Sequence, residues 1–303
     1  MEITVQATNN VFIVGTLVES TYHSPDEIPD KDKYISGQVS IATPSLDTDE
    51  AKENIIPVHF YAKKYKNDGN ANPAFDNISK MQSDFISKMT ANDVPGTTPS
   101  KVRINSGTLT ENAFYGNNDQ LVSGFRVRNA FFALAKAEEE AMVQFETKIV
   151  IANIKDEVDR EDNPTGRIVV KGVIVQYGGR AEFVEFIAED DNVIEAINSN
   201  WEQNETVKVS GRIRYYAKTL TEEASSDGDT FGRKVNKSKT FFVKELLIEG
   251  GSASPCDDDQ AYNIKDIGTA LTQRNERLEE SKKKSQEKNN KNKANSSGKA
   301  KGF

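Results

Sequence analysis

The feature that most limits the fold of this chain is an order of β-rich segments that occurs twice. Each half holds segments with β-branched and alternating apolar residues, and a helical pattern separates the third from the fourth. In the first half the expected strands cover residues 11–18, 34–43, 55–61, 101–110 and 121–134, and the expected helix covers 74–89. In the second half the expected strands cover residues 148–154, 167–177, 183–188, 207–216 and 240–248, and the expected helix covers 191–197. The repeated order therefore predicts two similar β domains in tandem.

Three strands, one helix and two further strands make up the layout of the five-stranded OB barrel. We therefore expect a mainly β protein with two tandem five-stranded OB-type barrels, each with a helix between strands 3 and 4, and a disordered basic C-terminal tail. The expected units are OB-fold domain 1 (1–140), OB-fold domain 2 (141–250), an acidic linker with a short helix (251–280) and a disordered Lys-rich tail (281–303). The tail has no aromatic residue before Phe303, and such a composition cannot build a core. Within the linker, apolar residues suggest a helix from Ile264 to about Leu278.

Short segments also resemble bacterial and phage single-stranded DNA-binding proteins. Residues 10–17, 55–60 and 209–214 look like the first, third and fourth strands of that family. The resemblance implies an OB fold that holds single-stranded DNA in replication, recombination or repair, with replication or recombination proteins as further partners. The end of the chain departs from the bacterial pattern, because residues 299–303 are basic where that family has an acidic tip with a terminal Pro-Phe. Partner recruitment through the tail is therefore not carried over.

Composition argues against several classes of protein. No stretch approaches the roughly 18 apolar residues that span a bilayer, and the N-terminus has no signal pattern, so we expect a cytoplasmic protein without a membrane partner. One cysteine and two histidines cannot assemble a disulfide framework or a Cys/His zinc site within one chain. No phosphate-cradling loop or nucleophile with a histidine partner is evident. We therefore expect a protein that is not an enzyme and has no cofactor or metal.

The charge is distributed unevenly along the chain. Residues 281–303 hold eight lysines and one glutamate, which gives this segment a charge of +7. Because the whole chain has a net charge of −8, residues 1–280 have a net charge of −15. An acidic body argues against purely electrostatic duplex binding, which needs many phosphate contacts. Proteins that bind single strands gain affinity from aromatic faces, so a local basic groove would suffice. The tail either contacts nucleic acid or neutralises the acidic body.

Aromatic and basic residues on the expected strands and loops of the first half are candidates for stacking on bases and contacting phosphates. They are Tyr34, His59, Tyr61, Lys63, Lys64, Arg103, Phe114, Tyr115, Arg126 and Arg128. The competing interpretation is that the aromatic residues belong to the core and the lysines form a solvated strand end. Arg103, Arg126 and Arg128 alternate with apolar residues, so a row of guanidinium groups would line one face.

In the second half, Arg212, Arg214 and Tyr216 are expected on one face of a strand, with Ile213 and Tyr215 pointing into the core. The face would offer two phosphate donors and a stacking ring, but cross-strand ion pairs are an equally good interpretation. The loop that follows is a usual nucleic-acid contact in OB barrels. The candidates for nucleic-acid contact in this loop and at its two ends are Lys218, Phe231, Arg233, Lys234, Lys237 and Lys239.

Three functions remain open at this point. The first is single-stranded DNA binding, in a phage protein and hence in the host cytoplasm if the divergent duplication marks a viral origin. The second is a non-enzymatic structural or adaptor protein that grips other proteins with its barrels, which the acidic body favours. The third is RNA binding, which differs in contacts to the 2′-hydroxyl that sequence does not reveal. The chain is expected to be a monomer or a homodimer.

Overall fold

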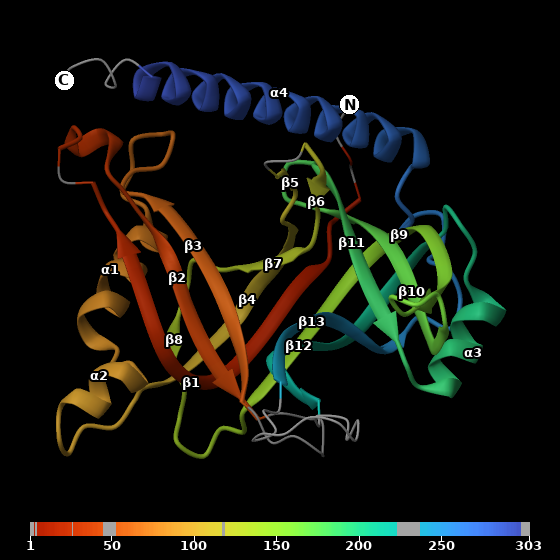
Figure 1. The fold of residues 1–303 in the computed structure, drawn as a ribbon, viewed down its shortest axis with the longest axis horizontal. Coiled ribbons are helices and arrows are strands. Elements are labelled where there is room, and N and C mark those ends of the chain that lie inside the picture. Colours follow the sequence, from red (N-terminus) through yellow and green to blue (C-terminus); the bar gives the residue numbers. More distant parts are fainter. Residues whose placement is uncertain are drawn as a thin grey trace, which may run out of the picture.

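The computed structural model describes residues 3, 5–25, 27–44, 53–116, 119–222 and 237–297 (Figure 1). Strands dominate it, which confirms the mainly β prediction. The α-helices are α1 (Pro73–Asp84), α2 (Lys88–Asp93), α3 (Asp191–Asn200) and α4 (Ile264–Ser297), and a 3-10 turn covers Asp30–Asp32. Figure 1 shows α1 and α2 beside the first half, α3 beside the second, and α4 lying across both.

The first half contains five strands that pair in a ring. They are β1 (Asn9–His23), β2 (Tyr34–Thr43), β3 (Asn54–Lys63), β4 (Lys101–Glu111) and β7 (Phe125–Arg128), with the short β5 (Phe114–Tyr115), β6 (Leu121–Val122) and β8 (Ala133–Leu134). β1 pairs with β2, β2 with β3, β3 in parallel with β7, β7 with β4, and β4 with β1. The expected strand order is therefore present in this half.

The second half is a closed five-stranded barrel. Its strands are β9 (Met142–Val158), β10 (Pro164–Val175), β11 (Ala181–Ala188), β12 (Thr206–Glu222) and β13 (Lys237–Gly251). β9 pairs with β10, β10 with β11, β11 in parallel with β13, β13 with β12, and β12 with β9. α3 lies between the third and fourth of these strands in the sequence, as predicted.

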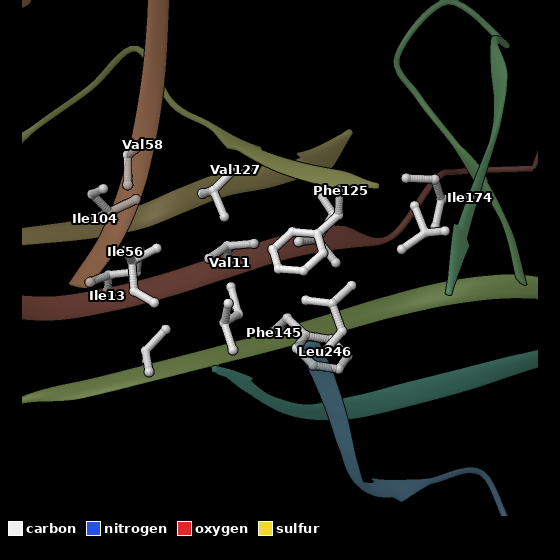
Figure 2. Packing of buried hydrophobic residues seen from close by; sticks show 14 of the residues in the cluster. Val11, Ile13, Ile56, Val58, Ile104, Phe125, Val127, Phe145, Ile174 and Leu246 are labelled. Atoms are coloured by element: carbon white, nitrogen blue, oxygen red, sulfur yellow. The ribbon is translucent and has the colours of Figure 1, made fainter. Parts of the chain in front are cut away.

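The two halves are joined by strand pairing and by a shared core. The first part of β1 pairs with β9, while its last part pairs with β2. Gly15 makes the close approach to β2 feasible, because a Cβ atom there would lie 2.3 Å from the carbonyl oxygen of Ala42. Phe125 from the first half and Phe145 and Leu246 from the second belong to one buried cluster (Figure 2). This continuous packing sets the position of one half against the other.

Two expected elements of the first half are interrupted. The predicted helix over residues 74–89 is split into α1 and α2, because the Ser87 side chain accepts a hydrogen bond from the Thr90 amide and starts a new helix. The predicted strand over residues 121–134 is split into β6, β7 and β8. There Asn129 Nδ2 donates to the Phe131 carbonyl at 2.6 Å, a local bond that competes with the ladder.

The last helix is much longer than predicted. The sequence suggested a short helix from Ile264 to about Leu278 and a disordered tail from residue 281, whereas α4 continues to Ser297. Residues 279–297 contain neither glycine nor proline and are rich in lysine and glutamate, which form helices well, so the helix can continue. The first turns of α4 pack against the second half through the buried side chains of Ile267 and Ala270. Among the described helices, none combines the length and apolar character that crossing a membrane requires.

Candidate nucleic-acid interface

A cleft of about 570 Å³ lies between the two halves of the molecule. β2, β3 and β7 form one wall, and β12 and β13 form the other. The residues that give the cleft its character are aromatic or basic: His59, Phe125, Arg126, Tyr215, Tyr216, Phe242 and Lys244. Phe242 is 76% exposed, so its ring stands in the cleft opening without core contacts to cover it. Such an exposed ring is available to a ligand.

Asn54 fixes the two walls against each other. β12 pairs with β9 up to Gly211 and leaves it beyond that residue, so some backbone groups there need another partner. Asn54 Nδ2 donates to the Ile213 carbonyl at 2.8 Å, and the Tyr215 amide donates to Asn54 Oδ1 at 2.6 Å. Asn54 is 3% exposed, so these bonds are protected from water. The spacing of the cleft is therefore built into the buried structure.

Arg126 and Lys244 of the cleft, and Arg128 beside it, have no carboxylate partner among the described residues. Within the described part of the chain, no carboxylate oxygen lies within 4.0 Å of the charged nitrogens of Arg126, Arg128 or Lys244. Arg126 donates to Asn112 Oδ1 at 2.7 Å, and Lys244 Nζ lies 5.0 Å from the centre of the Phe125 ring. Cations that are not neutralised nearby leave a positive potential for an anion.

Two carboxylates line the same cleft, and only one of them is paired with a cation among the described residues. Glu53 forms an ion pair with Lys88 at 2.8 Å. Glu19 accepts a hydrogen bond from the Ser40 hydroxyl at 3.0 Å. The cleft therefore has a basic side at β7 and β13, where Arg126 and Lys244 lie, and an acidic side at β1 and just before β3, where Glu19 and Glu53 lie. An anionic ligand is expected on the basic side.

The pKa of His59 is lowered in part by the positive charges around it. Burial, followed by the charges of Arg126, Arg128 and Lys244, lowers the pKa of His59 to about 4. Desolvation and the neighbouring Arg126 likewise lower the pKa of Lys244. His59 is thus neutral at pH 7 and acts there as a polar group without charge.

The low pKa of His59 predicts a loss of stability in mild acid. The unfolded chain binds a proton on this histidine below about pH 6.5, whereas the folded chain does so below about pH 4. Between these values the unfolded state holds more protons, so the free energy of unfolding falls as the pH falls. Urea denaturation at pH 7.5, 5.5 and 4.5 should show this decline, and His59→Gln should make it shallower. Equal slopes for both proteins would contradict the assignment.

A second hollow of about 700 Å³ shares His59 with the cleft. Tyr61, Arg128, Phe131 and Tyr177 line it. Arg126 and Arg128 lie on the same face of β7, on either side of the buried Val127. Arg126 lines the cleft, and Arg128 lines the second hollow. The two hollows therefore form one surface on which His59 is the common point.

Of the residues predicted for the first half, Tyr34, His59, Tyr61, Arg126 and Arg128 come together on this surface. Tyr34 belongs to it through Tyr61, because the centres of their rings lie 5.4 Å apart. The aromatic and basic pattern on β3 and β7 thus identified a real cluster of side chains.

Three other basic residues of the first half lie outside the cluster. Arg103 pairs with Glu139 at 3.2 Å, and Lys64 pairs with Asp30 at 2.6 Å. Lys63 is exposed at the end of β3. The expected row of guanidinium groups therefore contains Arg126 and Arg128 but not Arg103, which lies near the opposite end of β4.

The aromatic pair on the β5–β6 hairpin belongs to neither hollow. The Tyr115 hydroxyl donates to Glu279 of α4 at 2.8 Å, and Lys282 Nζ lies 4.5 Å from the centre of the Tyr115 ring. Phe114 is half exposed on the same hairpin. Tyr115 is thus used to hold the hairpin against α4.

The arginines of β12 form ion pairs, which is the alternative that the sequence left open. Arg212 pairs with Glu249, and Arg214 pairs with Glu189 at 2.6 Å. Ile213 is fully buried as expected, but Tyr215 and Tyr216 both line the cleft. Strict alternation therefore fails at the tyrosine pair, where the strand leaves β9 and passes along the cleft wall.

The remaining candidates belong to a region that the structure describes in part or not at all. Lys218 lies on β12, and Lys237 and Lys239 lie on β13, but their side chains are outside the description. Phe231, Arg233 and Lys234 lie outside the described residues. These six positions stay predictions.

Sequence reasoning missed Phe131, Tyr177, Phe242 and Lys244. Phe242 and Lys244 alternate with apolar neighbours on β13, a pattern that marks one outward face of the strand. Tyr177 precedes Gly178 and Gly179, which marks a turn but does not show what the turn approaches. Their common location depends on contacts between residues far apart in the sequence.

A family model described as YorF matches residues 7–284, which include both hollows and most of α4. The chain belongs to the YorF family. No curated protein matches the sequence of this YorF chain.

Solved structures are similar to the YorF chain in fold. The wild-type single-stranded DNA binding protein from Thermus aquaticus aligns with a TM-score of 0.50 and 13% identity, over 83% of this chain and 95% of that chain. A deletion mutant of the Thermus aquaticus protein aligns with a TM-score of 0.49 and 14% identity, over 84% of this chain and 97% of that chain. At such identity the likeness concerns the fold alone.

Proposed function

We propose that this YorF chain binds single-stranded DNA in the cleft between its halves. The observation that carries the proposal is a pair of cations, Arg126 and Lys244, that lack a carboxylate partner among the described residues and line the same cleft as the exposed Phe242. Arg128 adds a third such cation in the adjoining hollow. Phosphates would contact the cations, and bases would stack on Phe242 and on the tyrosines of β12. RNA would offer the same two chemical groups.

The same features favour a single strand over a duplex. Bases in a duplex are stacked on one another and cannot lie against protein rings, whereas unpaired bases can. The net charge of −8 gives the protein little general attraction for duplex phosphates. Affinity would therefore come from the cleft and not from the surface as a whole.

The wider proposal extends the fold and the role. We infer that residues 1–140 and 141–250 are tandem OB-type barrels, and the name of the similar Thermus aquaticus protein supports a role with single-stranded DNA. The protein would coat and protect DNA in replication, recombination or repair, without catalysis, in the cytoplasm of a phage-infected cell. Replication or recombination proteins would be its partners, and it would act as a monomer or homodimer.

A direct binding titration tests the proposal. A fluorescent oligothymidine, the matched duplex and the matched RNA are titrated with the full chain at low salt, and fluorescence anisotropy is followed. We expect the oligothymidine to bind more tightly than the duplex. Equal or absent binding of the single strand would reject the proposal, and it would favour the adaptor alternative.

Neutralising two cations of the cleft should lower both affinity and salt dependence. Each lost phosphate contact reduces the slope of log K against log salt by about 0.7 for a single strand. Arg126→Gln combined with Lys244→Gln should therefore reduce the slope by roughly 1.4. The matched control is Lys80→Gln with Lys155→Gln, which removes the same charge from exposed sites outside both hollows. Equal slopes for the two double variants would place the phosphates elsewhere.

A further inference from the structure

The second hollow is built by both halves of the chain. Tyr61, Arg128 and Phe131 come from the first half, and Tyr177 comes from the turn between β10 and β11 of the second. His59 stands on the border with the cleft. A ligand in the second hollow would thus continue directly from one in the cleft.

Tyr177 is 98% exposed and lies on a turn whose backbone position is fixed. Its neighbour Gln176 donates through Nε2 to the Leu109 carbonyl at 2.6 Å, which anchors the turn to β4 of the other half. Gly178 and Gly179 have φ values of 81° and 73°, which glycine adopts without strain. The Tyr177 ring is hardly covered by the protein and lies at the edge of the second hollow, so its faces are available to a ligand.

Phe131 is fixed in a comparable way. Its carbonyl accepts a hydrogen bond from Asn129 Nδ2 at 2.6 Å, and the next residue, Phe132, is buried with its amide donating to Asn77 Oδ1 at 2.7 Å. The peptide group that follows Phe131 is therefore held at both its oxygen and its nitrogen, while Phe131 itself remains 50% exposed. A backbone that is already ordered loses little entropy when a ligand binds to the side chains that it carries.

Tyr61 and Arg128 complete the chemistry of the hollow. The Tyr61 ring is 49% exposed and is supported from one side by Tyr34. Arg128 is exposed at the end of β7 and has no carboxylate partner within the described residues. Three aromatic rings around one free guanidinium match the flat faces and the phosphate of a nucleotide.

We propose that the second hollow is a nucleotide subsite, in which unpaired bases of the strand that fills the cleft stack on Tyr177, Phe131 and Tyr61. Arg128 contacts the phosphate of the same segment, and the strand passes His59 between the two hollows. The proposal rests on the proposed function and adds the path of the strand and a second group of bound nucleotides. It also explains why the turn of one half is anchored to the other.

The test is a length series of fluorescent oligothymidines bound by the wild type, Tyr177→Ala and Tyr177→Phe. For oligomers long enough to reach both hollows, Tyr177→Ala should weaken affinity about 5- to 140-fold, the range that one stacked base contributes. For the shortest oligomers that still bind the cleft it should change affinity less than about 2-fold. Tyr177→Phe keeps the ring and should bind like the wild type. Thermal midpoints should be equal, because the side chain is exposed.

The outcomes separate this inference from the proposed function. If Tyr177→Ala leaves the affinity for long oligomers unchanged while Arg126→Gln with Lys244→Gln weakens it, the subsite is rejected and the cleft remains. If Tyr177→Ala weakens short and long oligomers equally, the second hollow is not an extension of the path. If no oligomer binds the wild type, the proposed function itself fails.

Discussion

Replacing Arg274 by methionine should lower the free energy of unfolding by about 3 to 5 kcal/mol, because it leaves a buried carboxylate without its partner. Arg274 Nε donates to Glu111 Oε2 at 2.5 Å, and the two side chains are 9% and 5% exposed. The guanidinium also lies 5.0 Å from the centre of the Phe183 ring. The ion pair thus fastens α4 to β4 and β11, and urea denaturation followed by circular dichroism measures its loss.

Arg277→Met is the matched control, because Arg277 is exposed one turn further along α4. It should change the free energy of unfolding by less than about 0.5 kcal/mol. Combining Arg274→Met with Glu111→Leu should recover much of the loss, since both charges are then absent. If Arg274→Met proved as stable as Arg277→Met, the pair would contribute nothing to the attachment of α4.

Local sequence patterns predicted most strands because alternation is a local property. Residues 34–43 were expected as a strand and form β2 with the same bounds. In α4 the pattern was less informative, because beyond Leu278 the helix has a polar composition and little apolar periodicity. A polar segment of this kind fits a solvated helix and a disordered tail equally well. The attachment through Arg274 to a distant glutamate could not be read from the neighbouring residues.

The candidate site shows the same limit more clearly. His59 and Arg128 were predicted from aromatic and basic residues on strands, and the parallel pairing of β3 with β7 brings them together. Lys244 was missed because it approaches Phe125 across more than a hundred residues of sequence. Whether an arginine is free or paired also depends on distant residues, as the pairing of Arg214 with Glu189 demonstrates. Residue types could be predicted from sequence, but the set of free cations required the fold.

Replacing Asn54 by leucine should lower the free energy of unfolding by about 2 to 6 kcal/mol, because two buried backbone groups each lose a partner worth about 1 to 3 kcal/mol. The groups are the Ile213 carbonyl and the Tyr215 amide, which no longer pair with β9. Leucine has the same number and branching of side-chain heavy atoms as asparagine and is no smaller, so the loss comes from the unpaired polar groups and not from a cavity. Urea denaturation of the full chain measures it.

The same substitution should weaken oligothymidine binding, because Asn54 holds the backbone of β12 at Tyr215, and the Tyr215 and Tyr216 side chains line the cleft. Asn200→Leu is the matched control, since Asn200 is exposed and its side chain bonds within α3. It should cost less than about 0.5 kcal/mol and leave binding unchanged. If Asn54→Leu lost stability but bound normally, the aromatic wall of β12 would not contact the strand, and Arg126 and Lys244 would carry the interface. Equal stability of the two variants would mean that Asn54 does not hold the walls of the cleft together.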